Sequence, residues 1–414
     1  MILFKLIHES FLFAVGSLVV NKVRTILSLL GITIGIFSII AVFTVFDNLE
    51  NSIKTEINSL GNDVLFIQKW PWAMGGGDYP WWKYLQRPEP RFREMDQILK
   101  RSNTVDKATF MFNVSRNVYY RNNVVESVQI MAVSQDYIKV MPLEIGDGRY
   151  FTEQESHSAK NAAILGYDIA RNLFGGSEAI GKRVKVFGRK LDVIGVVKRK
   201  GDDIFGNSPD KVVYVPAEFA KGLVDYRHIG STIIVKAKPN VGIDEMKDEL
   251  TGIMRSIRKL KPAADDDFAL NQTDVISKGF DQLFGVISIV GWIIGGFSLL
   301  VGGFGIANIM FVSVKERTNQ IGIQKALGAK NYFILLQFLF EAVFLSLMGG
   351  VVGLLLVLIL TWVMGGLFDF SMTLSMKNII LGLSVSALIG FVSGFIPSWS
   401  ASRLDPVEAM RSNF

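Results

Sequence analysis

Residues 313–330 read SVKERTNQIGIQKALGAK and decide the fold, because they form a charged stretch between two long apolar ones. Residues 283–314 contain no Asp, Glu, Lys or Arg, and residues 331–361 contain only Glu341. A helix that spans a bilayer needs about 20 apolar residues, so each flank is long enough to cross. The charged stretch is then expected at a membrane surface. Its basic residues predict the cytoplasmic surface by the positive-inside rule: Lys315, Arg317, Lys325 and Lys330.

Within this stretch the spacing predicts a short helix whose apolar residues gather on one side: Ile321, Ile323, Ala326 and Leu327. Gly328 suits the end of this helix, and Asn331 suits the start of the next. A short basic helix held between two spans is suited to docking a soluble cytoplasmic protein. An ordinary solvated loop is the alternative that the residues alone leave open.

The composition predicts a membrane protein with a sizeable soluble part. Half of the residues are hydrophobic and only 20% are charged, below the roughly 25% of soluble domains. The net charge of +6 is spread along the chain, so nucleic-acid binding is not expected. Cysteine is absent, which excludes disulfides and thiolate metal sites. The histidines lie far apart in sequence, so no metal site is predicted: His8, His157 and His228.

The apolar runs predict four transmembrane helices, and the first two are expected to continue as stalks outside the membrane. Their predicted ranges, stalks included, are 23–61, 276–314, 331–364 and 378–402. Gly31 and Gly35 form a small-xxx-small pair that permits close packing on a helix that the sequence does not identify. Residues 1–22 are too short to span and are predicted to lie along the inner leaflet, with a cleaved signal peptide as the alternative. Residues 365–377 are expected as a short external loop, and residues 403–414 as a cytoplasmic tail.

Residues 62–275 predict a large α+β domain, possibly of two subdomains, on the side of the membrane opposite to the cytoplasm. Short β-rich runs predict strands at 63–68, 117–120, 124–133, 182–187, 191–197 and 231–236. Helical patterns occur at 91–100, 167–173 and 243–260. The fold class is therefore membrane α-helical, with four transmembrane helices and this domain inserted between the first and the second.

An aromatic cluster in this domain, WPWAMGGGDYPWWKYLQRPEP at residues 70–90, is a candidate contact for a substrate or a partner protein. Its aromatic residues are Trp70, Trp72, Tyr79, Trp81 and Trp82. The alternative is a loop that its own tryptophans fix to the domain.

Residues 176–182, GSEAIGK, have the spacing of a phosphate-binding loop but fail its context. Arg183 stands where a Ser or Thr would hold Mg²⁺, and a strand-like run follows instead of a helix. No nucleotide site is therefore expected in this sequence.

Glu341 is an ionisable residue inside the third predicted span, with Gln337 one turn before it. Such a residue is a functional candidate by default. No second carboxylate is evident at that depth, which argues against proton or substrate handling.

The charged stretch and the apolar run ILLQFLFEAVFLSLMGGVVG together resemble the signature of MacB/LolC/FtsX-class permeases of ABC transporters. VNKVRTILSLLGITIG, GDGRYFTEQE, NAAILGYDIARNLFGG and the tail ASRLDPVEAMR extend the resemblance over nearly the whole chain. The resemblance implies that the charged stretch is the coupling helix that contacts the ATPase. The residues implied are Lys315, Glu316, Arg317, Ile321, Gly322, Lys325, Ala326 and Gly328.

The resemblance implies a MacB-type permease subunit in a bacterial inner membrane, with both termini in the cytoplasm. It would work as a dimer with two copies of an ABC ATPase, a periplasmic membrane-fusion adaptor and an outer-membrane channel. ATP and magnesium would be held by the ATPase, and no cofactor by this chain. Export of antibiotics, peptides or other small molecules is the implied function. Lipoprotein release of the LolC type, or mechanical activation of a cell-wall hydrolase of the FtsX type, are the alternatives.

Overall fold

The computed structural model of the 414-residue chain describes residues 22–59, 61, 63–72, 79–202, 208–368 and 372–411. The surface helix predicted for residues 1–22 lies almost wholly outside the described residues. The chain divides into two compact units, Met1–Asn51 with Leu283–Phe414, and Ser52–Gln282. We call the first the helical unit and the second the sheet unit.

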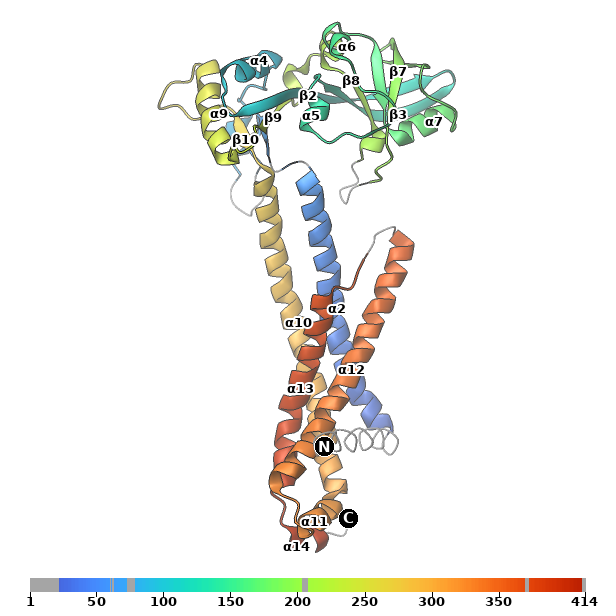
Figure 1. Ribbon diagram of the computed structural model, residues 1–414, viewed down its shortest axis with the longest axis vertical. Helices are drawn as coiled ribbons and strands as arrows, with labels where there is room; N and C mark the ends of the chain where they lie inside the picture. Colours follow the sequence, from blue (N-terminus) through green and yellow to red (C-terminus); the bar gives the residue numbers. More distant parts are fainter. Residues whose placement is uncertain are drawn as a thin grey trace. The chain divides into compact units, whose positions relative to one another are not determined.

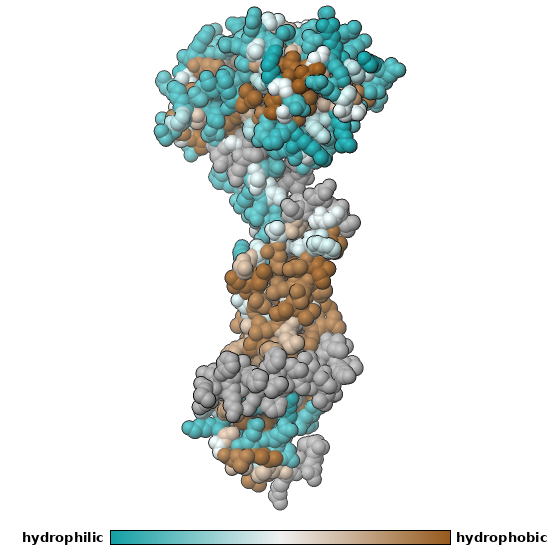
Figure 2. Space-filling model, turned by 45° about the vertical axis from the view of Figure 1, so that its right-hand side comes forward, coloured by the Kyte–Doolittle hydropathy of each residue, from teal (hydrophilic) through white to brown (hydrophobic). Residues whose placement is uncertain are grey.

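The helical unit is built on helices that are long and apolar, and four of them have the length and composition to cross a membrane (Figure 1). These are α2 (Lys22–Ser59), α10 (Thr273–Glu316), α12 (Asn331–Phe368) and α13 (Met376–Ser402). Two short helices, α11 (Thr318–Ala326) and α14 (Pro406–Arg411), complete the described part of the unit. Figure 2 shows apolar residues over the long helices, and hydrophilic residues again at the end that carries α11 and α14. Both α2 and α10 run without a break across the boundary between the two units.

Glycines allow the long helices to pack closely. A Cβ added at Gly31 would lie 3.3 Å from the Cα of Gly302, and one at Gly35 would lie 3.2 Å from Leu299. The partner of the small-xxx-small pair in α2 is therefore α10. On the other side of the unit, a Cβ at Gly394 would lie only 2.3 Å from that of Ala342, so α12 and α13 approach each other closely.

The sheet unit is organised around one hydrogen-bonded sheet (Figure 1). Its strands follow the order β10-β1-β9-β2-β3-β8-β5-β7-β4, and β6 pairs with β2 and β7. The pairs β3–β8 and β5–β7 are parallel, and the other pairs are antiparallel. The strands are β1 (Val64–Gln68), β2 (Val105–Tyr120), β3 (Asn123–Val133), β4 (Ile145–Gly148), β5 (Ala162–Leu165), β6 (Arg183–Val186), β7 (Arg189–Val197), β8 (Val212–Pro216), β9 (Thr232–Ala237) and β10 (Ala269–Asn271).

Helices cover this sheet and bury its main core, in which the side chains of Phe110 and Phe112 are almost fully enclosed. The α-helices are α3 (Trp81–Tyr84), α4 (Phe92–Arg101), α5 (Tyr137–Val140), α6 (Glu153–His157), α7 (Tyr167–Phe174), α8 (Ala217–Lys221) and α9 (Ile243–Ile257). Two 3₁₀ turns are η1 (Pro209–Lys211) and η2 (Tyr226–His228). The GSEAIGK segment follows the end of α7 and precedes β6, the reverse of the strand–loop–helix order of a phosphate-binding loop.

Buried carboxylates connect the elements of the sheet unit. Glu94 on α4 accepts hydrogen bonds from Arg258 at 3.0 and 3.1 Å. Glu249 on α9 accepts hydrogen bonds from the hydroxyl of Ser102 (2.6 Å), the hydroxyl of Thr104, and the backbone N–H groups of Asn103 and Thr104. Partial burial acts to raise the pKa of Glu249, but these hydrogen bonds outweigh it and hold the pKa at about 2. The carboxylate therefore fixes α9 to the loop between α4 and β2.

Candidate functional site

Residues 318–326 of the charged stretch form α11, a short helix between the ends of α10 and α12. Thr318, the first residue of α11, donates its hydroxyl to the carbonyls of Val314 (3.0 Å) and Lys315 (2.9 Å), so the turn out of α10 is closed locally. Gly328 has φ +98°, a left-handed conformation that glycine adopts without steric cost. The prediction that Gly328 ends the helix is confirmed, since α11 stops at Ala326.

One side of α11 is buried against the rest of the helical unit. Ile321 is 1% exposed. Gly322 packs on α14, where an added Cβ would lie 2.9 Å from that of Ala409. Lys325 donates to the backbone carbonyls of Ser402 (2.7 Å) and Leu404 (2.8 Å), at the end of α13 and just after it. Figure 1 shows α11 and α14 side by side. Lys325 therefore connects α11 to the tail through two hydrogen bonds.

The prediction that Ile321 lies with Ile323, Ala326 and Leu327 on one side of the helix is wrong. Ile323 is 48% exposed and Leu327 84% exposed, and Ala326 is exposed too, whereas Ile321 is enclosed. At about 100° per residue, positions 321 and 323 lie nearly opposite each other on a helix. The apolar residues are therefore divided between an inner and an outer side.

Helix α14, which packs on α11, also has exposed apolar side chains, Val407 and Met410. The exposed Lys315 and Glu316 lie at the end of α10 that leads into α11. We call Ile323, Ala326, Leu327, Val407 and Met410 the outer surface. It is apolar at its centre with charged residues beside it, which are the properties of a protein-docking patch.

Arg317 connects this end of the unit to α12. Its guanidinium donates to a carboxylate oxygen of Glu341 at 3.3 Å, and the Glu341 side chain is only 2% exposed. Two further polar atoms are buried nearby along the same helices, the hydroxyl of Ser313 and the amide oxygen of Gln337, and neither has a hydrogen-bond partner in the described part of the chain. A buried carboxylate with a guanidinium partner suits a structural tie between the α10–α11 junction and α12.

In the sheet unit, the aromatic cluster divides into two groups. Trp72 packs on Phe66 with ring centroids 5.0 Å apart, and its backbone N–H donates to Asn271 at 2.9 Å. The backbone carbonyl of Trp70 accepts from the Asn271 side chain at 2.8 Å, and Tyr79 donates its hydroxyl to the carbonyl of Pro71 at 2.9 Å. Trp81 and Trp82, in contrast, are each 55% exposed on α3. Residues 73–78 of the cluster lie outside the described residues. Trp70 is itself 36% exposed, so among the described aromatic residues of the cluster Trp81 and Trp82 are the most exposed but not the only exposed ones.

Among the described residues, no group of three or more His, Cys, Asp or Glu side chains is arranged to hold a metal ion. The features described above as a candidate site are the outer surface and the Lys325 and Arg317 contacts that connect the helices.

Comparison with known proteins identifies both units. Residues 25–253 match the MacB-like periplasmic core domain, and residues 292–406 match the FtsX-like permease C-terminal region. The chain is 30% identical over 407 residues to the macrolide export ATP-binding/permease protein MacB of Neisseria meningitidis serogroup A. It is 31% identical over 413 residues to the probable syringafactin export ATP-binding/permease protein SyfD of Pseudomonas syringae pv. tomato. These alignments cover 97% and 98% of this chain, and 60% and 59% of the relatives.

A crystal structure of the periplasmic region of MacB from Actinobacillus actinomycetemcomitans aligns with 55% of this chain, with 20% sequence identity and a TM-score of 0.44. The alignment covers 97% of the crystallised chain. This chain spans about three fifths of the length of MacB and SyfD, the two curated relatives named above. Because the periplasmic core domain match alone covers more than half of the chain, and the FtsX-like match covers the second part of α10 and all of α12 and α13, this protein belongs to the MacB/FtsX class of multi-pass inner-membrane permeases.

Proposed function

We propose that this permease works in ATP-driven export, and that an ATP-binding partner acts on it through the outer surface of α11 and α14. The observation that carries the proposal is the combination of that exposed surface with the internal contacts beneath it. A partner that displaced α11 would also displace the tail, through Lys325, and α12, through Arg317 and Glu341.

Continuous helices would carry the displacement onward. Helix α10 begins at Thr273 and ends at Glu316, one residue before the N-cap of α11. It therefore joins α11 to the sheet unit as one 44-residue helix. Within the helical unit, α2 is packed on α10 through the glycine contacts and also continues into the sheet unit. A movement made at α11 would thus reach the sheet unit through helical backbone, and a substrate site at the middle of the membrane is not needed.

The names of the two relatives support export as the direction of transport and ATP as the energy source, since both relatives are described as export ATP-binding/permease proteins. On this proposal α11 and both termini lie in the cytoplasm, and the sheet unit lies on the other side of the membrane. The complex contains two copies of the permease and two of the ATP-binding partner, with a membrane-fusion adaptor and an outer-membrane channel. ATP and magnesium are bound by the partner, and the cargo is an antibiotic, a peptide or another small molecule.

The test is affinity purification of the full chain in mild detergent, identification of the ATP-binding partner, and measurement of ATP hydrolysis with and without the permease. The variant is Leu327→Glu, which changes a side chain that is 84% exposed and so should not disturb folding. We expect stimulation of ATP hydrolysis to fall by about tenfold or more, because a charge in the apolar centre of an interface is desolvated without a partner.

The matched control is Leu223→Glu, the same exchange at an exposed leucine of the sheet unit, which should leave the stimulation unchanged. Normal stimulation with Leu327→Glu would show that the partner does not dock on the outer surface.

A further inference from the structure

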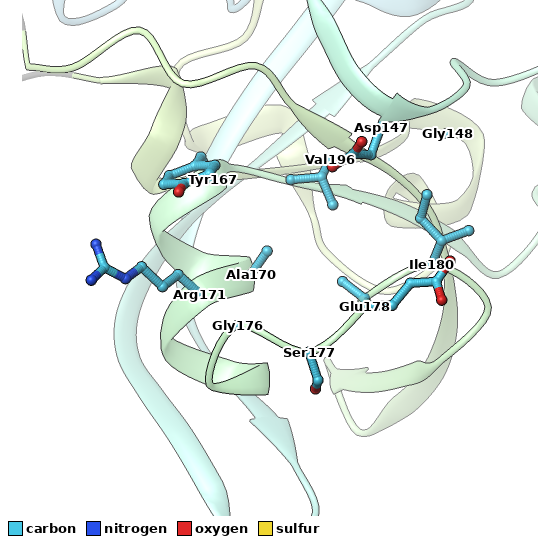
Figure 3. Close-up of a pocket in the computed structure, with 11 residues that line it drawn as sticks. Asp147, Gly148, Tyr167, Ala170, Arg171, Gly176, Ser177, Glu178, Ile180 and Val196 are labelled. Carbon is cyan, nitrogen blue, oxygen red and sulfur yellow. The ribbon is translucent and has the colours of Figure 1, made fainter.

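The loop at residues 175–182, between α7 and β6, borders two hollows in the sheet unit. One of them, of about 470 Å³, has Ala170 and Val196 in its floor (Figure 3). In that view the Ser177 side chain points away from this floor, and its hydroxyl donates to the carbonyl of Phe174 at 2.7 Å. Ser177 also lines the second hollow, of about 520 Å³, which is formed by the β2–β3 turn (residues 120–123), the end of α7 and Lys182.

The second hollow has a positively charged lining and an aromatic floor. Its charged lining residues are Arg121 and Lys182, and no carboxylate lines it. Both cations lie against one ring, with the Arg121 guanidinium 5.3 Å and the Lys182 ammonium 5.9 Å from the centroid of Tyr120. The ring of Phe174 lies 4.4 Å from that of Tyr120 and 4.9 Å from the Lys182 ammonium. Two positive charges thus flank a single apolar surface.

No carboxylate among the described residues neutralises these two positive charges. Asn123 donates to the carbonyl of Leu173 at 2.7 Å, and Ser177 donates to that of Phe174, so the last carbonyls of α7 are satisfied without Lys182. The Lys182 ammonium donates to the neutral hydroxyl of Ser177 at 2.9 Å. Among the described residues, the adjacent Arg183 pairs with Asp192 at 2.8 Å, whereas neither Arg121 nor Lys182 has a carboxylate partner.

The backbone of Arg121 is in a conformation that glycine or asparagine would adopt more easily. Its φ is +49°, in the left-handed region that other side chains rarely occupy. Arg121 is the first residue of the two-residue turn between the paired Tyr120 and Asn123, where the favoured turn types require a positive φ. Arg121 lines the hollow together with Asn122, whose amide is a further hydrogen-bond donor.

We propose that this hollow binds a small organic anion, with a phosphate or carboxylate group between Arg121 and Lys182 and its apolar part on Tyr120 and Phe174. Guanidinium and ammonium groups form strong charge-assisted hydrogen bonds with such anions, and the planar guanidinium matches phosphate with two donors. The volume is in the range of sites for small molecules. The same chemistry is found in a free phosphate ester and in a phospholipid head group, and the experiment separates these two sources.

The experiment uses the full chain in phosphatidylcholine nanodiscs and phenyl phosphate as the probe, with saturation-transfer NMR as the measurement. The variant carries Arg121→Asn and Lys182→Gln together. Asparagine tolerates the left-handed backbone, and glutamine retains a donor for Ser177, so both exchanges remove charge with little disturbance. We expect the affinity for phenyl phosphate to fall by about ten- to a hundredfold.

The control variant carries Lys185→Gln and Lys190→Gln, which remove the same charge from exposed positions that face each other on β6 and β7 outside the hollow. Unchanged binding by the control supports a defined site. An equal loss in both variants would mean general attraction by the basic surface, and no loss in the first variant would place the ligand elsewhere. Either result overturns the proposal, as does equal saturation transfer to benzyl alcohol, which has the ring without the anion.

Competition identifies the source. If vesicles that contain phosphatidic acid displace phenyl phosphate and vesicles of phosphatidylcholine alone do not, the natural ligand is a lipid head group. If neither displaces it while soluble phosphate esters do, the natural ligand is a free organic anion.

Discussion

Glu341 brings a negative charge into the packed interior between α10 and α12, and Arg317 compensates it. Removing one partner of a buried ion pair leaves the other charge without compensation, at a cost of about 3–5 kcal/mol. Because of this ion pair, a substitution at Arg317 can act in two ways, on the binding of a partner and on the internal packing. Loss of coupling to a partner and loss of the internal tie would both follow from Arg317→Glu.

A charge exchange separates these two effects. Arg317→Glu alone should lower the melting temperature of the detergent-solubilised chain and abolish stimulated ATP hydrolysis. The double variant Arg317→Glu with Glu341→Arg should recover most of the melting temperature, because opposite charges again face each other. Recovered ATP hydrolysis in the double variant would assign Arg317 to the internal tie. If hydrolysis stays absent in the restored fold, Arg317 contacts the partner directly. Lys330→Glu, at an exposed site, is the control for charge alone.

Glu249 predicts how the sheet unit responds to acid. Its pKa is held at about 2, against an ordinary value of 4.5, so the folded state favours the carboxylate. Its contribution to stability is therefore complete above pH 4.5 and is lost as the pH falls toward 2. Thermal unfolding followed by tryptophan fluorescence at pH 7 and pH 3 should show a smaller acid-induced loss in Glu249→Gln than in the unchanged chain. Glu245→Gln, on the exposed side of α9, should behave like the unchanged chain.

At the scale of elements, the sequence predicts best where periodicity and burial agree. The four long helices, the strands β1, β3, β6, β7 and β9, and the helices α4, α7 and α9 all follow from their patterns. Strands β5 (AAIL) and β8 (VVYVP) were missed because they are buried on both faces, so the alternation that marks a half-exposed strand is absent. Most of β2 was missed for a related reason, since it pairs with β3 on one side and β9 on the other.

Helix α11 and its place between two long helices could be predicted from the sequence, but the contacts that its residues make could not. The spacing of charges indicates α11 and its position between two spans. No local pattern indicates that Lys325 will meet carbonyls 77 and 79 residues further on, or that Arg317 will meet Glu341. Those contacts depend on how α12 and α13 fold back, which is a tertiary property.

The packing of α2 on α10 can be tested with two nearby glycines of the same helix. A Cβ at Gly302 would lie 2.9 Å from Cγ1 of Ile32 and 3.0 Å from its backbone nitrogen, whereas one at Gly296 would meet nothing within 4 Å. Gly302→Ala should therefore lower the melting temperature of the detergent-solubilised chain by several degrees. Gly296→Ala should leave it unchanged or raise it slightly, because alanine is the better helix former by about 1 kcal/mol. Equal effects of the two exchanges would contradict close helix contact at Gly302.

The division within the aromatic cluster predicts different results for its tryptophans. Trp72→Ala should destabilise the sheet unit by about 3–5 kcal/mol if the packing on Phe66 is fully lost. The double variant Trp81→Ala with Trp82→Ala should leave the melting temperature unchanged, because both rings are exposed. Transport that is reduced in this double variant would assign the pair to a substrate or partner. Normal transport would leave them as surface residues, and an unfolded double variant would contradict their exposure.

At the scale of the whole molecule, the proposal places α11 and the sheet unit on opposite sides of the membrane. The chain contains no cysteine, so single cysteines can be introduced into an otherwise unreactive background. A maleimide that does not cross membranes should label Leu223→Cys in spheroplasts with intact cytoplasmic membranes. It should label Leu327→Cys only after permeabilisation. Labelling of Leu327→Cys from outside would invert the topology and remove the basis for a cytoplasmic partner.

The contact of Lys325 with the carbonyls of Ser402 and Leu404 also has a consequence for biosynthesis. Ser402 follows Lys325 by 77 residues, so a ribosome must complete α12 and α13 before the lysine has anything to hold. A nascent chain therefore exposes α11 in an unanchored form during that interval. The hydrogen bonds of Lys325 can therefore form only late in synthesis, once the chain has been translated beyond Leu404.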